Sequence, residues 1–572
     1  MNKLWGALRF MLANTDKVHI ICFGAILLMM LVLAVLHHRW QHYEREMKLW
    51  KKLCLIPLGI TTVHYFIFVS GFDGFLMRYS PMYLTAIIAL LPVLCAVHKK
   101  GYRVTASAVG VLSVVFCVSF FISPTKAHNY TRKSYTKSFR ALVKEMDRSY
   151  VIKEWKEIDF SALEEKYMPQ VREAEQESDP AKFADAVIMF CNELHDGHVA
   201  VHTNYDREKY ASVSELKDYG LSMTELDSGE VIAVCTNEKV HSLGIKDGTV
   251  ITKWNGMPVL QAAEEKIPGC GQPVRSNAER LALFELAGSG GESVEVSFID
   301  DADTEQTTTL SALDNEHTYD DAYDRFAHLP ENYSDLITSN YHTEMLDDKC
   351  GYLILSAETI ENVVSDNICF YAGKSRSKGR MFRSKLRKLR EQGMEYLIID
   401  MRNNMGGNSA VGVELCSLFT NEDRYSMGLG VRRGGENIRL TENMICADGE
   451  FADLSVVVLT NFESISAGDV TARDLAKLPN VTLAGITDPN GSGQITGGCC
   501  ILSDSIVSVN YPIGLTLDEN GEPDIDTRAD QVSRDPVEVR IPFDYDAAMK
   551  IFRDKEDYEL EWAVNYLENN AE

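Results

Sequence analysis

Four apolar runs within the first 122 residues constrain this chain most, because such runs must be buried in a protein core or in a lipid bilayer. A helix rises about 1.5 Å per residue, so roughly 20 apolar residues cross a hydrocarbon core about 30 Å thick. A cleaved signal peptide would contribute one such run. The runs therefore predict a four-helix transmembrane head over residues 1–125. They are Val18–Leu36, Leu53–Phe72, Met82–Val97 and Val104–Ile122.

The distribution of charge predicts how this head is oriented. The loops 37–52 and 98–103 contain five and three Lys or Arg residues, whereas the loop 73–81 contains one. Cytoplasmic loops carry the excess of basic residues, so the first and third loops are expected in the cytoplasm and both termini outside. This orientation of the loops and termini predicts a multi-pass protein of the cell membrane whose larger, soluble part is extracytoplasmic.

The soluble part is strongly acidic. Residues 1–130 hold 13 Lys and Arg against 4 Asp and Glu, while the whole chain has a net charge of −26. Such acidity disfavours a nucleic-acid partner, since phosphate binding needs a cationic surface. The chain has 13 cysteines, but no Cys-x-x-Cys pair or Cys/His zinc spacing. We therefore expect no disulfide framework, no metal site and no cofactor.

The pattern of residues divides the soluble part into segments, so the fold is predicted to be multi-domain. Apolar residues at helical spacing predict a helical cap, and short strands with Gly turns predict a β-rich module. Apolar β-branched strands that alternate with helices then predict a mainly parallel α/β core. The predicted segments are the helical part 135–207, the β-rich module 208–312, a connector 313–348, the α/β core 349–553 and a C-terminal tail 554–572.

One motif places a serine at the start of a helix. The buried strand 454–460 ends in a short loop, and Ser466 then opens a helix. Free backbone N–H groups at a helix start stabilise negative charge on a nearby oxygen, which favours a serine nucleophile and its tetrahedral intermediate. The alternative is that Ser466 only caps the helix.

A second motif, Ile398–Gly407, carries a buried strand into a Gly-Gly turn. Glycine lets a backbone approach a substrate closely and direct N–H groups toward it. One oxyanion donor could come from Gly406 or Gly407 and the other from the amide of Ala467. The alternative is an ordinary turn between a strand and a helix.

A third motif, Asp196-Gly197-His198, presents a histidine just before a strand. A serine nucleophile needs a base with a pKa near neutrality, and histidine is the usual one. A single histidine is more often structural. The assignment of His198 as a general base therefore depends on the serine and glycine motifs.

These motifs, in this order, resemble the landmarks of the carboxyl-terminal processing protease and tricorn family of serine peptidases. The resemblance implies a ClpP/crotonase-like core with Ser466 as nucleophile. Its Ser–Lys members carry a lysine about 25 residues after the serine, but the matching loop 485–493 has none. The resemblance therefore favours the tricorn-like design, in which His198 acts with an acidic residue. That residue would be Glu522 or, alternatively, Asp524.

The β-rich module 208–312 resembles the PDZ-like domain of the same family. The backbone of Tyr219, Gly220, Leu221 and Ser222 would then form the loop that captures a chain terminus by strand addition. The alternative is a generic β module.

Together these features predict a membrane-anchored serine endopeptidase that acts on extracytoplasmic proteins or peptides. Two alternatives stay open: a catalytically inactive protein that binds a ligand or peptide on the same fold, and a membrane sensor whose head transmits the state of its ligand. The sequence does not fix the oligomeric state.

Overall fold

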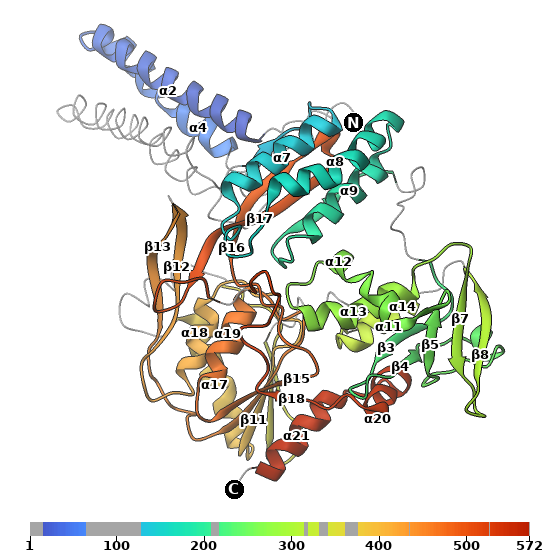
Figure 1. The fold of residues 1–572 in the computed structure, drawn as a ribbon. Coiled ribbons are helices and arrows are strands. Elements are labelled where there is room, and N and C mark those ends of the chain that lie inside the picture. The colour runs from blue at the N-terminus through green and yellow to red at the C-terminus, as the bar shows by residue number, and fades with distance from the viewer. Residues whose placement is uncertain are drawn as a thin grey trace.

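The computed structural model describes most of the chain in four connected parts (Figure 1). These are a group of N-terminal helices, a helical layer on a sheet, a β-rich unit and an α/β core. The described residues are 15–64, 127–206, 217–313, 318–330, 341–360, 376–433, 435–524 and 527–570.

The N-terminal helices do not form the predicted transmembrane head. In the part of the chain that the structure describes, no helix has both the length and the apolar composition needed to cross a bilayer. The second apolar run, Leu53–Phe72, enters α4 (Leu55–His64), and residues 65–72 of this run lie outside the described residues. The prediction of a transmembrane head over residues 1–125 is therefore wrong. The third and fourth runs lie outside the described residues.

The two helices before α4 contact each other through buried side chains. α2 (Thr15–Trp40) and α3 (Glu44–Leu53) meet where the indole of Trp50 donates a hydrogen bond to the carbonyl of Leu33 at 2.7 Å. Six of the ten residues of α3 are charged, which limits its apolar face to one side.

A helical layer packs on a sheet built from distant parts of the chain. The side chains of Asp159 and Asp179 cap two of its helices by accepting backbone N–H groups. The helices are α7 (Tyr135–Ser149), α8 (Phe160–Glu177) and α9 (Pro180–Asn192), and the strands are β1 (Ala127–Asn129), β2 (Ala200–Thr203), β12 (Arg424–Arg433), β13 (Glu436–Ile445), β16 (Ile495–Ile501) and β17 (Val507–Leu517). The three helices share one apolar core with β16 and β17.

The β-rich unit contains a two-stranded and a four-stranded sheet, with α13 packed on the first strand. Its strands are β3 (Ser222–Glu225), β4 (Val231–Val234), β5 (Ile251–Trp254), β6 (Met257–Pro258), β7 (Ser293–Ile299) and β8 (Glu305–Ser311). Its helices are α10 (Glu238–His241), α11 (Val259–Glu264), α12 (Ile267–Cys270) and α13 (Arg275–Ala287).

The core is a six-stranded sheet with helices on both faces, which confirms the predicted mixed α/β architecture. Its order is β18-β15-β14-β11-β10-β9, and all neighbours are parallel except β9. The strands are β9 (Tyr341–Met345), β10 (Cys350–Leu355), β11 (Tyr396–Asp400), β14 (Ser455–Leu459), β15 (Val481–Gly485) and β18 (Val539–Arg540). Helices α17 (Ser377–Glu391), α18 (Ala410–Ser417) and α19 (Ala467–Ala476) cover one face, and α14 (Thr318–Phe326) and α21 (Tyr558–Asn570) pack on the other.

Parallel strands end at the same edge of a sheet, and this geometry positions the candidate site. The carboxyl ends of β10, β11 and β14 lie side by side, because the register pairs Ile354 with Asp400 and Asp400 with Leu459. The loops that follow these strands therefore meet at one edge.

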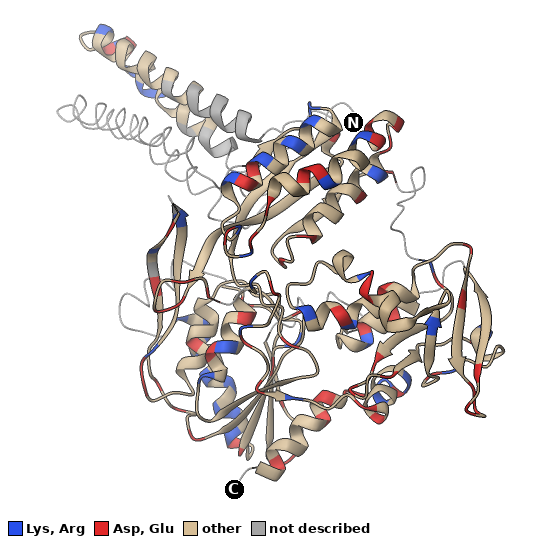
Figure 2. Cartoon of the chain, in the orientation of Figure 1, with Lys and Arg blue, Asp and Glu red and all other residues tan. Residues whose placement is uncertain are grey.

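Two segments are more ordered than the sequence indicated. The connector 313–348 contains α14, whose Ala322 and Phe326 are buried. The segment predicted as a tail contains α21, anchored by Ala563 and Leu567. α17 is a basic helix, and Figure 2 shows its Lys and Arg residues gathered along it. Three of its arginines form ion pairs with the acidic stretch 448–453.

Candidate active site

Ser466 lies at the turn between β14 and α19. It has φ 64° and ψ −127°, a conformation that costs a non-glycine residue about 1–3 kcal/mol and persists only when its surroundings enforce it. Its N–H donates to the carbonyl of Ser492 at 2.8 Å, and the preceding N–H of Ile465 donates to Asn404 at 2.9 Å. Although Ser466 occupies the N-cap position, its hydroxyl makes no capping hydrogen bond. The half-buried side chain is thus held in a strained turn without serving as a cap.

The Gly-Gly turn lies directly against Ser466. A β-carbon on Gly406 would come within 2.5 Å of the Ser466 β-carbon and 2.6 Å of the Ala467 nitrogen, so no larger residue fits there. The N–H of Gly406 donates to the side chain of Asn404 at 2.8 Å. Among the described residues, the N–H groups of Gly407 and Ala467 have no hydrogen-bond acceptor. These two amides are therefore available for an oxyanion, whereas the Gly406 amide is already engaged.

His198 is held by a tight turn at the end of the helical layer. Asp196 accepts the backbone N–H of His198 at 2.9 Å with one carboxylate oxygen and the hydroxyl of Tyr150 at 2.8 Å with the other. The ring nitrogen Nδ1 lies 3.3 Å from Oε1 of Gln494. Burial lowers the pKa of His198 from its ordinary value, although Asp196 and Gln494 act in the opposite direction. At neutral pH the imidazole is therefore neutral, as a general base requires.

The loop 490–494 joins the histidine turn to the serine turn. The N–H of Gly197 donates to the hydroxyl of Ser492 at 3.0 Å, while the carbonyl of the same Ser492 accepts the N–H of Ser466. A β-carbon on Gly197 would also come within 2.6 Å of the Ile465 side chain. The histidine turn and the serine turn, more than 260 residues apart in sequence, thus pack against each other.

Asp469, in the first turn of α19, fixes this loop to the nucleophile helix. Its Oδ2 accepts the N–H groups of Gly491 at 2.7 Å and Ser492 at 3.0 Å. The sequence motif around Ser466 therefore has a second use, because Asp469 holds the segment that bridges Ser466 and His198.

The acidic residues predicted to assist His198 are not brought to its ring. Glu522 is exposed in a turn, where its N–H donates to Asp518 at 2.9 Å. Asp524 forms an ion pair with Arg473 of α19. Gln494 occupies the position beside Nδ1 instead. Sequence reasoning missed Gln494, and the one available signal was its place just after the loop 485–493, where a lysine was sought and not found.

Three of the buried cysteines have unreactive thiols and do not compete with Ser466 as nucleophiles. Burial raises the pKa of Cys191, Cys416 and Cys500, so their thiols stay protonated. Among the described residues, no group of three His, Cys, Asp or Glu side chains is placed to hold a metal ion.

The loop predicted to capture a peptide terminus is covered. Tyr219, Leu221 and Ser222 are at most 1 % exposed. Thr318, at the start of α14, donates from its hydroxyl to Asp218 at 2.8 Å and to the carbonyl of Leu221 at 3.4 Å. Capture of a chain terminus by this loop stays a prediction and would require α14 to move.

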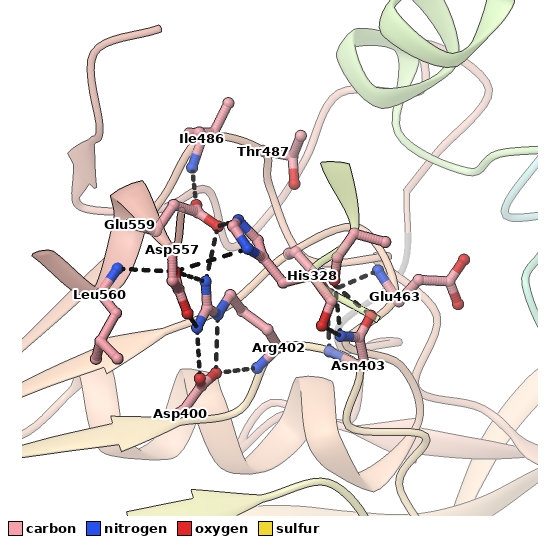
Figure 3. Close-up of polar contacts among 12 residues, drawn as sticks. His328, Asp400, Arg402, Asn403, Glu463, Ile486, Thr487, Asp557, Glu559 and Leu560 are labelled. Carbon is pink, nitrogen blue, oxygen red and sulfur yellow. Dashed lines mark hydrogen bonds and ion pairs between the residues drawn. The ribbon is translucent and has the colours of Figure 1, made fainter. Parts of the chain in front are cut away.

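A buried charge network surrounds Arg402, just after the end of β11 (Figure 3). The guanidinium of Arg402 binds Asp400 at 2.6 Å, Asp557 at 2.7 Å and Glu559 at 3.3 Å, and His328 lies 3.0 Å from Glu559. The network joins the end of β11 to the C-terminal part of the chain and to the residues that follow α14. It thereby fixes the start of the segment that carries Gly406 and Gly407.

Comparisons with known proteins agree with the motifs. Residues 365–535 match the model of Peptidase family S41. A carboxyl-terminal-processing protease of Synechocystis sp. is 35% identical over 101 residues, which are 18% of this chain and 22% of that protein. The chain thus matches about a fifth of that relative's length. The family model and the relative agree, over part of the chain, with the resemblance to carboxyl-terminal processing proteases, and both matches support the prediction of a serine peptidase.

The solved structure of CPAF resembles the chain in fold. The crystal structure of mature CPAF has a TM-score of 0.50 at 14% identity and covers 77% of this chain and 98% of that one. The crystal structure of the tricorn protease has a TM-score of 0.33 at 14% identity and covers 76% of this chain and 36% of that one. At this identity the likeness to CPAF shows a shared fold alone.

Proposed function

We propose that this chain is a serine peptidase that hydrolyses peptide bonds in protein or peptide substrates, with Ser466 as nucleophile and His198 as general base. The observation that carries the proposal is the strained, uncapped Ser466 packed between a glycine turn and the loop that holds His198. Such strain collects at functional sites because only an enforced geometry keeps the reactive atom exposed.

The reaction follows from the roles of these groups. His198 removes the proton of the Ser466 hydroxyl as the oxygen attacks the substrate carbonyl, and then gives that proton to the leaving amine. Water, activated by the same imidazole, hydrolyses the acyl-enzyme and regenerates Ser466. The amides of Gly407 and Ala467 would hold the oxyanion, and loss of one such donor typically costs about 10²–10³-fold in kcat.

Gln494 would replace the acidic partner of the tricorn-like design. When Nδ1 of His198 donates its proton to Oε1 of Gln494, the other nitrogen, Nε2, is left unprotonated and can accept the serine proton. A neutral amide orients the ring and raises the pKa of the imidazole less than a carboxylate would. This arrangement suits a base whose pKa burial has already lowered.

A glutamate at position 494 tests this role. Because the pKa of His198 is lowered, the wild-type acid limb of kcat/KM should lie below pH 6.5. In Gln494→Glu a carboxylate beside the ring favours the imidazolium, so the limb should move up by about one pH unit. The measurement is kcat/KM from pH 5 to 8. Gln392→Glu, on the end of α17, is the control and should leave the limb in place.

Labelling by a fluorophosphonate tests the proposal directly. The reagent should modify Ser466, as located by mass spectrometry, and the label should be lost in Ser466→Ala. A label on another serine, or none in the intact protein, would reject the assignment.

A binding protein without hydrolysis is the second candidate. It is favoured by one observation: no hydrogen bond joins the His198 ring to the Ser466 hydroxyl among the described contacts. Peptide binding that survives while labelling and cleavage are absent would support it. The extracytoplasmic location of the protein and its substrates stays a prediction, which cell fractionation can test.

A further inference from the structure

Glu358 is a buried acid beside the glycine turn that the proposed reaction does not use. It follows β10 and is 1 % exposed. Its backbone extends the parallel pairing of the sheet by an isolated bridge to Gly407. Its N–H donates to the carbonyl of Gly406 at 2.8 Å, and its carbonyl accepts the N–H of Asn408 at 2.7 Å. The main chain of Glu358 thus holds both sides of the turn.

The side chain of Glu358 reaches the two helices that follow the turn and the nucleophile. Its Oε1 accepts the hydroxyl of Thr471, in α19, at 2.7 Å. The backbone N–H of Gly412, in α18, also interacts with this carboxyl group. A β-carbon on Gly412 would lie 1.8 Å from the Thr471 hydroxyl, so the two helices touch where the carboxyl joins them. One residue therefore connects the glycine turn with the helix that Ser466 opens.

The surroundings favour the neutral form of this acid. Its Oε2 is buried and has no hydrogen-bond partner among the described residues. No Lys or Arg forms an ion pair with it in the described part of the chain, and Asp474 of α19 adds a negative charge nearby. Burial raises the pKa of Glu358 to about 8, although the hydrogen bonds from Thr471 and Gly412 lower this pKa in part. Glu358 is also one of the groups that raise the pKa of Cys416 in α18.

We propose that Glu358 is a positioning residue for the oxyanion hole, and that it holds the Gly406–Gly407 turn against α19 as a neutral carboxylic acid. This inference rests on the proposed peptidase function. Ionisation would place an unpaired charge between the turn and the nucleophile helix, where desolvation is costly. The turn and α19 would then separate, and the Gly407 and Ala467 amides would no longer converge on one oxygen.

The expected consequence is a loss of activity at alkaline pH. As pH rises through about 8, the neutral fraction of Glu358 falls, and kcat should decline by about tenfold between pH 7 and 9. Glu358→Gln, which keeps the shape and an acceptor for Thr471, should retain kcat at pH 7 and remove this decline. Glu358→Ala should lower kcat at pH 7 by about tenfold or more, with a smaller change in KM.

Two further variants, one at the partner of Glu358 and one control at a distant buried acid, distinguish a positioning role from a general effect on stability. Thr471→Val removes the donor to Glu358 and should lower kcat in the same direction as Glu358→Ala. Glu285→Gln removes another acid whose pKa burial raises, but in α13 of the β-rich unit, and should leave the alkaline decline unchanged. If Glu358→Gln keeps the wild-type decline, or Glu358→Ala keeps the wild-type kcat, the proposal is overturned.

A measurement that needs no activity distinguishes this proposal from the peptidase function. The folded pKa of Glu358 is raised above its ordinary value of 4.5, so its contribution to stability is present below pH 4.5 and is lost as pH rises through about 8. The melting temperature of the wild type should therefore fall relative to Glu358→Gln between pH 5 and 9. Parallel curves would refute the neutral acid even if Ser466-dependent hydrolysis is found. Diverging curves would support it even if hydrolysis is not found.

Discussion

Replacing Ser466 by alanine is expected to lower kcat by at least about 10⁴-fold, because the acyl-enzyme can no longer form. The fold should survive, since the hydroxyl of Ser466 caps no helix and the residue is held through its backbone. The measurement is hydrolysis of an unfolded protein substrate, with melting temperature as the check on folding. A variant that keeps more than a tenth of the wild-type kcat would remove Ser466 from the reaction.

His198→Ala should lower kcat by a similar factor, and the double variant should lose little more than either single one. Residues that act as one unit are strongly non-additive, so this pattern distinguishes a Ser–His pair from two independent contributions. His202→Ala is the matched control, because His202 is exposed on β2, four residues beyond His198. Losses that multiply in the double variant would contradict the pairing.

The core and the outline of the site were predictable because they depend on local patterns. β11 and β14 are short apolar runs followed by turn residues. This pattern is typical of a strand that is buried on both faces of a sheet. Parallel strands end at one edge, so the glycine turn and the serine turn had to meet. His198 could be placed only through the family resemblance, since nothing local marks one histidine among 14.

The partners of the site residues were not predictable, because they come from contacts between distant parts of the chain. Gln494 lies 296 residues from His198, and Thr471 lies 113 residues from Glu358. The acidic partner was sought at Glu522, in a polar stretch that the structure places in an exposed turn. The transmembrane head was inferred from apolar runs in the sequence, but no described helix combines the length and the apolar composition that crossing a bilayer requires.

Replacing Arg402 by methionine is expected to destabilise the core by about 3–5 kcal/mol at pH 7, because it leaves buried carboxylates without their cation. Burial alone would raise the pKa of Asp557, but Arg402 lowers it well below the ordinary value. The stability that this carboxylate contributes is present above its ordinary pKa of 3.8 and is lost as pH falls below that value. The deficit of the variant should therefore be large at pH 7 and should become smaller only as pH falls below 3.8.

Arg387→Met is the matched control for this prediction. Arg387 also forms an ion pair, with Glu450, but it is 59% exposed on α17. Exposed pairs contribute about 0–1 kcal/mol, so this variant should unfold at nearly the wild-type urea concentration. Equal shifts of the urea midpoint in the two variants would show that the ion pairs of Arg402 contribute no more to stability than the exposed ion pair of Arg387. A large shift in Arg402→Met alone, accompanied by a fall in kcat, would show that the buried network holds the glycine turn in its catalytic position, since that turn begins four residues after Arg402.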